Sequence, residues 1–178
     1  MTTTTPAALP AATRIGHIHL KVADLDRALA FYRDTLGFAV TLRHGDQAAF
    51  LSAGGYHHHI GLNTWESKGG AAPPHGSTGL YHFAINYPER RDLAAALVRL
   101  FANGWGIDGA SDHGTHEAVY LHDPDGNGIE LACDRAPEFW LKDGQMISGR
   151  QALDFASLLA ELNDPATERL LPTLASYT

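Results

Sequence analysis

The chain has 178 residues, of which 44% are hydrophobic and 19% charged, a length and composition that indicate one folded domain or two small modules sharing a core. Its net charge of −7 excludes binding to nucleic acid or to an anionic membrane through bulk charge. Its one cysteine, Cys133, excludes a disulfide within the chain and a thiolate metal cluster.

Residues 1–13 are rich in Thr, Pro and Ala and lack the basic segment of a signal peptide. No apolar run along the chain reaches the length of a membrane span. We therefore expect a disordered leader, residues 1–13, on a cytoplasmic protein.

The first regular pattern is an alternation over residues 15–22, which predicts a strand with His17 and His19 on its polar face. Asp24 then suits the N-cap of a helix with apolar residues at helical spacing, and Gly37 suits its end. Strand-like runs follow over residues 38–43, 47–52 and 56–63. Residues 67–78, rich in Gly, Pro and Ser, are predicted to be a linker.

The same order then repeats. A strand is predicted over residues 80–86, and Pro88 opens a helix that ends near Asn103. Strands near 105–110, 117–122 and 128–133 complete the second copy. This duplication predicts an α+β fold in which two βαβββ modules, about 14–66 and 79–135, form a half-open mixed β-barrel. The remaining residues, 136–178, are predicted to be a helical extension packed on the outside of the domain.

A hairpin is predicted at residues 119–132, V-Y-L-H-D-P-D-G-N-G-I-E-L-A, because two strand-like runs flank a cluster of turn-forming residues. Alternation turns Glu130 away from the face that Ile129 and Leu131 share. If residues 123–127 close the hairpin, Tyr120 lies opposite Glu130, within reach across the strands. A carboxylate beside a tyrosine on an inner sheet face indicates a binding site.

Overlaying the two repeats places His17 on His82, and both lie on the polar face that Glu130 shares. Two imidazoles and one carboxylate are typical of non-haem Fe(II) sites, and Mn(II), Zn(II), Ni(II) or Co(II) could occupy the same ligands. His19 shares the face of His17, so alternation alone leaves the choice between them open. The overlay favours His17, because His19 matches Ala84.

Three consecutive histidines precede Ile60, and alternation turns His57 and His59 inward and His58 outward. The overlay also puts His59 close to Glu130. His59 could be a fourth ligand, a proton-transfer group beside the metal, or a polar residue that supports the ligands.

Three segments together resemble the vicinal oxygen chelate superfamily, which includes glyoxalase I, bleomycin-resistance proteins, fosfomycin-resistance enzymes and extradiol dioxygenases. They read G-H-I-H-L-K-V-A-D-L-D-R-A-L-A-F-Y-R-D-T-L-G-F (16–38), G-L-Y-H-F-A-I (79–85) and Y-L-H-D-P-D-G-N-G-I-E-L (120–131). Two more segments, G-G-Y-H-H-H-I-G-L-N-T-W (54–65) and D-R-A-P-E-F-W (134–140), are similar to the catechol 2,3-dioxygenase-like branch.

The resemblance implies a metal, Fe(II) or alternatively Mn(II), and a catechol cleaved by O2 beside its two hydroxyls. It implies roles for six residues: metal binding at His17, His82 and Glu130, and catalysis at His59, Tyr120 and His113. The match of His113 is looser, because the loop length differs. Branch members carry aromatic residues where this chain has Ala132-Cys133, which predicts a reshaped pocket floor.

The leading hypothesis is thus an Fe(II)-dependent extradiol ring-cleaving dioxygenase for a small catechol. The alternatives are a glyoxalase-type divalent-metal isomerase, lyase or transferase, and a resistance protein that binds a small molecule without turnover. Glyoxalase I has glutamate where His59 stands, which counts against the isomerase. A homodimer is compatible with the fold but not required, because one chain supplies both halves of the site.

Overall fold

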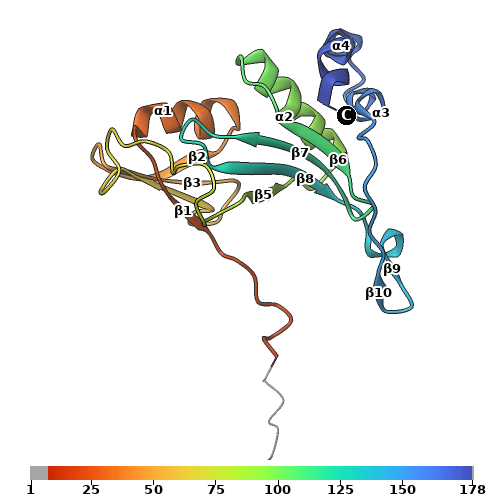
Figure 1. Cartoon of the computed structure of the whole chain (residues 1–178), viewed down its shortest axis with the longest axis horizontal. Helices are drawn as coiled ribbons and strands as arrows, with labels where there is room; N and C mark the ends of the chain where they lie inside the picture. The colour runs from red at the N-terminus through yellow and green to blue at the C-terminus, as the bar shows by residue number, and fades with distance from the viewer. Residues whose placement is uncertain (1–7, 178) are drawn as a thin grey trace, which may run out of the picture.

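The computed structural model describes residues 8–177 and contains the strand–helix–three-strand order twice (Figure 1). The first module consists of β1 (Ile18–Lys21), α1 (Leu25–Leu29) with its π-helical continuation (Ala30–Thr35), β2 (Ala39–His44), β3 (Ala48–Ser52) and β4 (Ile60–Asn63). The second consists of β5 (Phe83–Asn86), α2 (Arg90–Ala102), β6 (Gly109–Asp112), β7 (His116–His122) and β8 (Gly128–Asp134). The predicted α+β fold of two βαβββ modules is confirmed.

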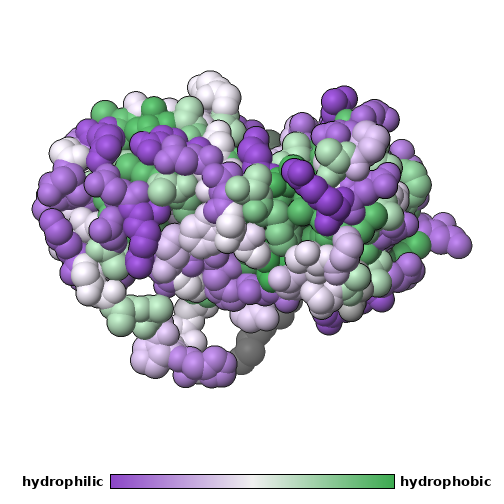
Figure 2. All heavy atoms as spheres, turned by 90° about the horizontal axis from the view of Figure 1, so that it is seen from above, coloured by the Kyte–Doolittle hydropathy of each residue, from purple (hydrophilic) through white to green (hydrophobic). Residues whose placement is uncertain are grey.

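Each module forms one mixed four-stranded sheet, in the orders β1-β4-β3-β2 and β5-β8-β7-β6. The first and last strands of each module, β1 with β4 and β5 with β8, pair in parallel, and the other pairs are antiparallel. Both helices lie on the same side of the sheets (Figure 1). Seen from that side, the two modules form two lobes on which polar and apolar residues are interspersed (Figure 2).

The strand register corrects one feature of the sequence overlay. In the parallel pairs, Gly61 faces His19 in the first module, and Glu130 faces Ala84 in the second. Gly61, not His59, therefore occupies the position in the first module that Glu130 occupies in the second. The overlay that put His59 close to Glu130 was two residues out of register at β4. A Cβ at position 61 would lie 2.9 Å from the ring of His19, so the imidazole fills the space that a side chain there would need.

The first helix begins and ends where the sequence predicts. The Asp24 carboxylate accepts a hydrogen bond from the Arg27 amide at 2.8 Å, and Gly37 adopts a φ of 91° just after the helix. Its apolar side packs into the core together with α2, whose Leu93 and Leu97 are fully buried. The core thus lies between the helices and the sheet faces beneath them, which leaves the opposite sheet faces for the candidate site.

The turn of the β7–β8 hairpin also joins the two modules. The Asp123 carboxylate accepts hydrogen bonds from the backbone amides of Asp125 and Asn127, at 2.9 and 2.8 Å, which fixes the turn. Its other oxygen accepts a hydrogen bond at 2.8 Å from the buried hydroxyl of Tyr32, on the first module. Asp125 in turn pairs with Arg27 at 2.6 Å. The turn therefore holds the first module at a fixed position against the second.

Replacing Tyr32 by phenylalanine is expected to lower the free energy of unfolding by about 1.5–3 kcal/mol, because the buried Asp123 carboxylate loses a hydrogen-bond donor. Burial, with the charge of Asp123, raises the pKa of Tyr32, so its hydroxyl remains a donor at neutral pH. Urea unfolding measures the loss. The matched control is Tyr81→Phe, at a side chain that is 89% exposed. Equal stability of the two variants would contradict this role.

Beyond β8 the chain forms a short hairpin and then returns to the second module. The segments are β9 (Leu141–Lys142), β10 (Gln145–Met146), α3 (Phe155–Ala160) and α4 (Leu171–Leu174), with 3-10 turns at Pro137–Phe139, Pro165–Leu170 and Ala175–Tyr177. The first tail helix, α3, packs against α2. Before it, Gln151 and Asp112 exchange two backbone hydrogen bonds of 2.8 and 2.9 Å, so the tail runs along the free edge of β6.

Of the predicted leader, residues 1–13, the first seven residues lie outside the described part of the chain, and residues 8–13 contain no helix or strand. The strand predicted from residue 15 begins at Ile18. Among residues 8–177, no helix has both the length and the apolar character needed to cross a membrane.

Candidate active site

The first predicted ligands of each module occupy equivalent places. His17 directly precedes β1 and His82 directly precedes β5, each the edge strand of its sheet. Both line a cavity of about 630 Å³ between the modules, which His59, directly before β4, also lines. Phe38 is part of its apolar wall. Three of the predicted site residues, from positions far apart in the sequence, therefore meet at one cavity.

Glu130 lies on β8 directly opposite Tyr120 on β7, which confirms the predicted hairpin register. Its side chain is buried, and its Oε2 lies 2.9 Å from the Nε2 atom of His82. Its Oε1 lies 2.7 Å from the Nε2 atom of His116 and accepts a longer hydrogen bond, 3.5 Å, from the Tyr120 hydroxyl. Among residues 8–177, these two imidazoles are the basic side chains in contact with Glu130, and no arginine or lysine forms an ion pair with it.

His17 lines the cavity with His82 and His59, whereas Glu130 does not line it. The ring centroid of His17 is 4.4 Å from that of His58, and its side chain makes no ion pair with Glu130. Within the described residues, no three His, Cys, Asp or Glu side chains stand close enough together to hold a metal ion. The structure thus joins two of the three predicted ligands, His82 and Glu130, and places the third on the facing module.

The hydrogen bonds of His59 determine which of its ring nitrogens carries the proton in the neutral form. Its Nδ1 atom accepts a hydrogen bond from the Ala53 amide at 3.3 Å and lies 3.1 Å from the Ser52 hydroxyl. Because that nitrogen accepts, the neutral ring carries its proton on Nε2. The Tyr56 ring lies 4.9 Å away and covers one side. Neutral His59 is therefore a hydrogen-bond donor at the cavity.

Tyr120 and His113 form a pair beside Glu130. The Nε2 atom of His113 lies 2.7 Å from the Tyr120 hydroxyl. The structure thus brings together Tyr120 and His113, although the family resemblance placed His113 less securely. Burial, reinforced by the charge of Glu130, raises the pKa of Tyr120 to about 12. The Tyr120 hydroxyl is therefore protonated at neutral pH and available as a donor.

His116 is the neighbour of Glu130 that the sequence did not single out. Its Nδ1 atom lies 2.7 Å from the Thr115 hydroxyl, and its ring stacks on His113 at 4.8 Å. The predicted strand began at residue 117, whereas β7 begins at His116. A strand one residue longer would have revealed it, because alternation from Tyr120 puts His116 on the same face.

Two other histidines lie away from Glu130. The Nε2 atom of His19 lies 3.0 Å from the Asn63 amide nitrogen, the ring packs edge-on against Trp65, and burial lowers its pKa. It does not line the cavity of His17. His122, exposed at the end of β7, pairs with Asp108 at 2.6 Å.

The three consecutive histidines do not follow the predicted alternation. They precede β4, which begins at Ile60, and so lack strand geometry. His58, predicted to point outward, packs against His17, and its Nδ1 atom lies 2.7 Å from that of His57. His57 in turn packs against Tyr56. Only His59 of the three lines the cavity.

Comparison with proteins of known structure identifies this fold. A glyoxalase/dioxygenase from Nostoc punctiforme of known structure superposes with a TM-score of 0.60 at 21% identity, over 75% of this chain and 100% of that one. This likeness shows the fold of the glyoxalase class.

The family follows from the sequence. Residues 14–131 match the model of the Glyoxalase/Bleomycin resistance protein/Dioxygenase superfamily, and the chain belongs to this superfamily. It is 42% identical over 155 residues to a catechol-2,3-dioxygenase of Bacillus subtilis (strain 168), covering 85% of this chain and 53% of that protein. It is 30% identical over 123 residues to biphenyl-2,3-diol 1,2-dioxygenase 3 of Rhodococcus globerulus, covering 68% and 63%. The chain thus spans between half and two thirds of the length of these two relatives.

Proposed function

We propose that the protein is an extradiol dioxygenase that cleaves a small catechol with O2 and a divalent metal, Fe(II) in the first instance. The observation that carries the proposal is the buried carboxylate of Glu130, contacted by His82 and Tyr120, in a chain 42% identical to a catechol-2,3-dioxygenase.

The residues present suit a divalent metal. A carboxylate is costly to bury without a compensating positive charge, and among residues 8–177 Glu130 pairs only with imidazoles. We propose His17, His82 and Glu130 as ligands, a set of two imidazoles and one carboxylate that suits Fe(II) and also Mn(II). When bound, the metal would hold both catechol oxygens and mediate electron transfer from the ring to O2.

The protein side chains would supply position and protons. Phe38 and Phe83 line the cavity with apolar surface against which an aromatic ring can pack. The Tyr120 hydroxyl, held by His113, can donate to an oxygen of the substrate, and Nε2–H of His59 can donate to a second oxygen from the first module. Any proton that His59 transfers would come from its imidazolium form, which would return to the neutral ring and be protonated again by solvent.

Oxygen uptake tests the proposal. Protein loaded anaerobically with Fe(II) is mixed with a panel of catechols, and we expect one O2 consumed for each catechol together with a yellow ring-cleaved product. The control is the same protein stripped of metal. If no catechol causes uptake or a yellow product, the protein is not an extradiol dioxygenase.

The same assay separates the alternatives. A glyoxalase-type enzyme would convert its substrate with metal but without consuming O2. The structure gives such a site little support, because Gly61 occupies the first-module position equivalent to Glu130 and leaves no second carboxylate there. A binding protein without turnover would retain its ligand unchanged in the presence or absence of metal.

Replacing His116 by alanine is expected to weaken metal binding by about 10- to 100-fold, the usual effect of removing a residue that orients a metal ligand. The reason is its 2.7 Å contact with Oε1 of Glu130, which leaves Oε2 facing His82. Chelator competition with Mn(II) measures the affinity. His122→Ala, an exposed histidine on the same strand, is the control. Unchanged affinity would contradict the positioning role, as would complete loss of binding, which would make His116 itself a ligand.

A further inference from the structure

Arg150 lies on the tail segment that runs along β6, outside the part of the chain matched by the family model. Gln151 pairs with Asp112, and the Gly149 amide donates a hydrogen bond of 2.9 Å to the His113 carbonyl. Arg150, between them, faces the opposite way from Gln151, because successive residues of an extended segment alternate. This turns Arg150 toward the sheet face of Ser111, whose hydroxyl accepts a hydrogen bond from its Nε at 3.3 Å.

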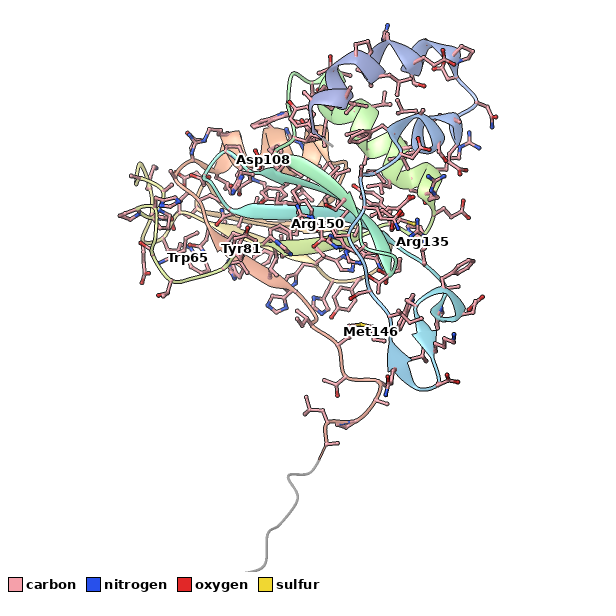
Figure 3. All side chains as sticks on the ribbon, turned by 45° about the vertical axis from the view of Figure 1, so that its right-hand side comes forward. Trp65, Tyr81, Asp108, Arg135, Met146 and Arg150 are labelled. Carbon is pink, nitrogen blue, oxygen red and sulfur yellow. The ribbon has the colours of Figure 1, made fainter. Side chains whose placement is uncertain are left out.

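That face is the one that carries the candidate active site. In the β6–β7 register, Ser111 is opposite Ala118 and Gly109 is opposite Tyr120, so these residues share the face of Glu130. Figure 3 shows Arg150 against the second sheet. The tail therefore adds a cation to the same face as the proposed catalytic tyrosine.

Arg150 and Tyr120 line one cavity of about 640 Å³. Three small residues, Gly109, Ala110 and Ser111, line it together with Asp108, whose carboxylate lies 2.6 Å from Nδ1 of His122. Tyr120 borders both regions, because it lines this cavity and its hydroxyl donates a hydrogen bond of 3.5 Å to Glu130. A substrate held near Glu130 can therefore extend a ring substituent past Tyr120 toward Arg150.

The charge of Arg150 is available to such a substituent. The nearby Arg135 is bound by Asp112 and Glu117, and Arg90 by Glu117 and Glu161. Arg150, by contrast, forms no ion pair with any carboxylate among residues 8–177. With Nε bonded to Ser111, its two terminal nitrogens remain as a fork that matches a carboxylate.

We propose that Arg150 binds a carboxylate on the substrate, so that the preferred substrate is a catechol bearing a carboxylate substituent and not an uncharged catechol. The inference rests on the proposed dioxygenase function. It assigns the tail a part in substrate recognition beyond its packing on α2.

The test compares 3,4-dihydroxybenzoate with its uncharged methyl ester, using Fe(II)-loaded protein and oxygen uptake. The measured quantity is the ratio of kcat/KM for the acid to kcat/KM for the ester. In Arg150→Gln this ratio is expected to fall about 10- to 100-fold, as for loss of a charge-assisted hydrogen bond. Arg150→Lys keeps the charge but not the two parallel donors of the guanidinium group. Its acid-to-ester ratio is expected to lie between that of wild type and that of Arg150→Gln. The control is Arg169→Gln, which removes an equal charge from an exposed part of the same tail.

A second readout does not need turnover. Binding of the acid and the ester, measured by calorimetry under anaerobic conditions, is expected to show tighter binding of the acid by wild type and by Arg169→Gln, and no such preference in Arg150→Gln. If the protein turns over the ester and Arg150→Gln leaves the acid-to-ester ratio unchanged, the role of Arg150 is wrong while the dioxygenase function stands. If neither compound, nor any other catechol, is consumed, the dioxygenase function fails and this inference with it. A purely structural role for Arg150 would lower both rates equally and leave the ratio intact.

Discussion

Replacing Glu130 by glutamine is expected to reduce divalent-metal affinity by more than 100-fold and to abolish catechol-dependent oxygen uptake. The substitution keeps the shape of the side chain but removes the charge that would bind the cation. Altering residues that merely orient ligands costs about 10- to 100-fold, so loss of a ligand should exceed that range. Chelator competition with Mn(II) measures affinity, and circular dichroism checks that the variant is folded.

The matched control for this variant is Glu117→Gln. Glu117 is also a buried carboxylate, but it lies on the opposite face of the second sheet, where it pairs with Arg90 and Arg135. Its loss should lower stability, because Arg90 keeps only Glu161 and Arg135 only Asp112 as a carboxylate partner, without changing metal affinity. A Glu130→Gln protein that bound metal as tightly as wild type would remove Glu130 from the ligand set. Equal loss of affinity in both variants would point to a general defect of the second sheet.

The architecture was predictable because its signals are local. Asp24 and Gly37 mark the ends of the first helix through capping and backbone conformation, which neighbouring residues decide. The hairpin register that sets Tyr120 opposite Glu130 follows from the turn cluster between them. The repeated order of elements then gave the modular fold without knowledge of any long-range contact.

Two features were not predicted from the sequence, the register of the parallel strands and the position of Arg150, because both depend on contacts between distant segments. Two parallel strands joined through a helix and two further strands have no turn to fix their register, so the sequence did not show that Gly61 is the counterpart of Glu130. The position of Arg150 depends on the tail pairing with β6 through Gln151, a single bridge with no local motif.

The candidate site divides in the same way. The pairs His82–Glu130 and His113–Tyr120 form within one module, and the residue types that the sequence selected do meet there. His17 and His59 come from the other module, and their approach to Glu130 depends on how the two sheets face each other. The hydrogen bond between Tyr32 and Asp123 is one of the contacts that fix this arrangement, and no sequence pattern predicted it.

Replacing His59 by glutamine is expected to lower kcat by about 10²- to 10⁴-fold, the range for loss of a general acid or base, with little change in metal affinity. The Ala53 amide and the Ser52 hydroxyl occupy Nδ1, so neutral His59 offers a hydrogen bond from Nε2, and a proton transferred from that nitrogen would come from the imidazolium form. Oxygen uptake at saturating catechol measures kcat. His57→Gln, a neighbouring histidine that does not line the cavity, is the control.

The same variant decides among the three roles that the sequence left open for His59. Reduced turnover with normal metal affinity would support proton transfer. Loss of metal binding comparable to that of Glu130→Gln would make His59 a fourth ligand, and full turnover with normal affinity would leave it a supporting polar residue. Ser52→Ala adds a graded check: removing one of the two groups at Nδ1 should weaken the orientation of the ring and reduce kcat by less than His59→Gln does.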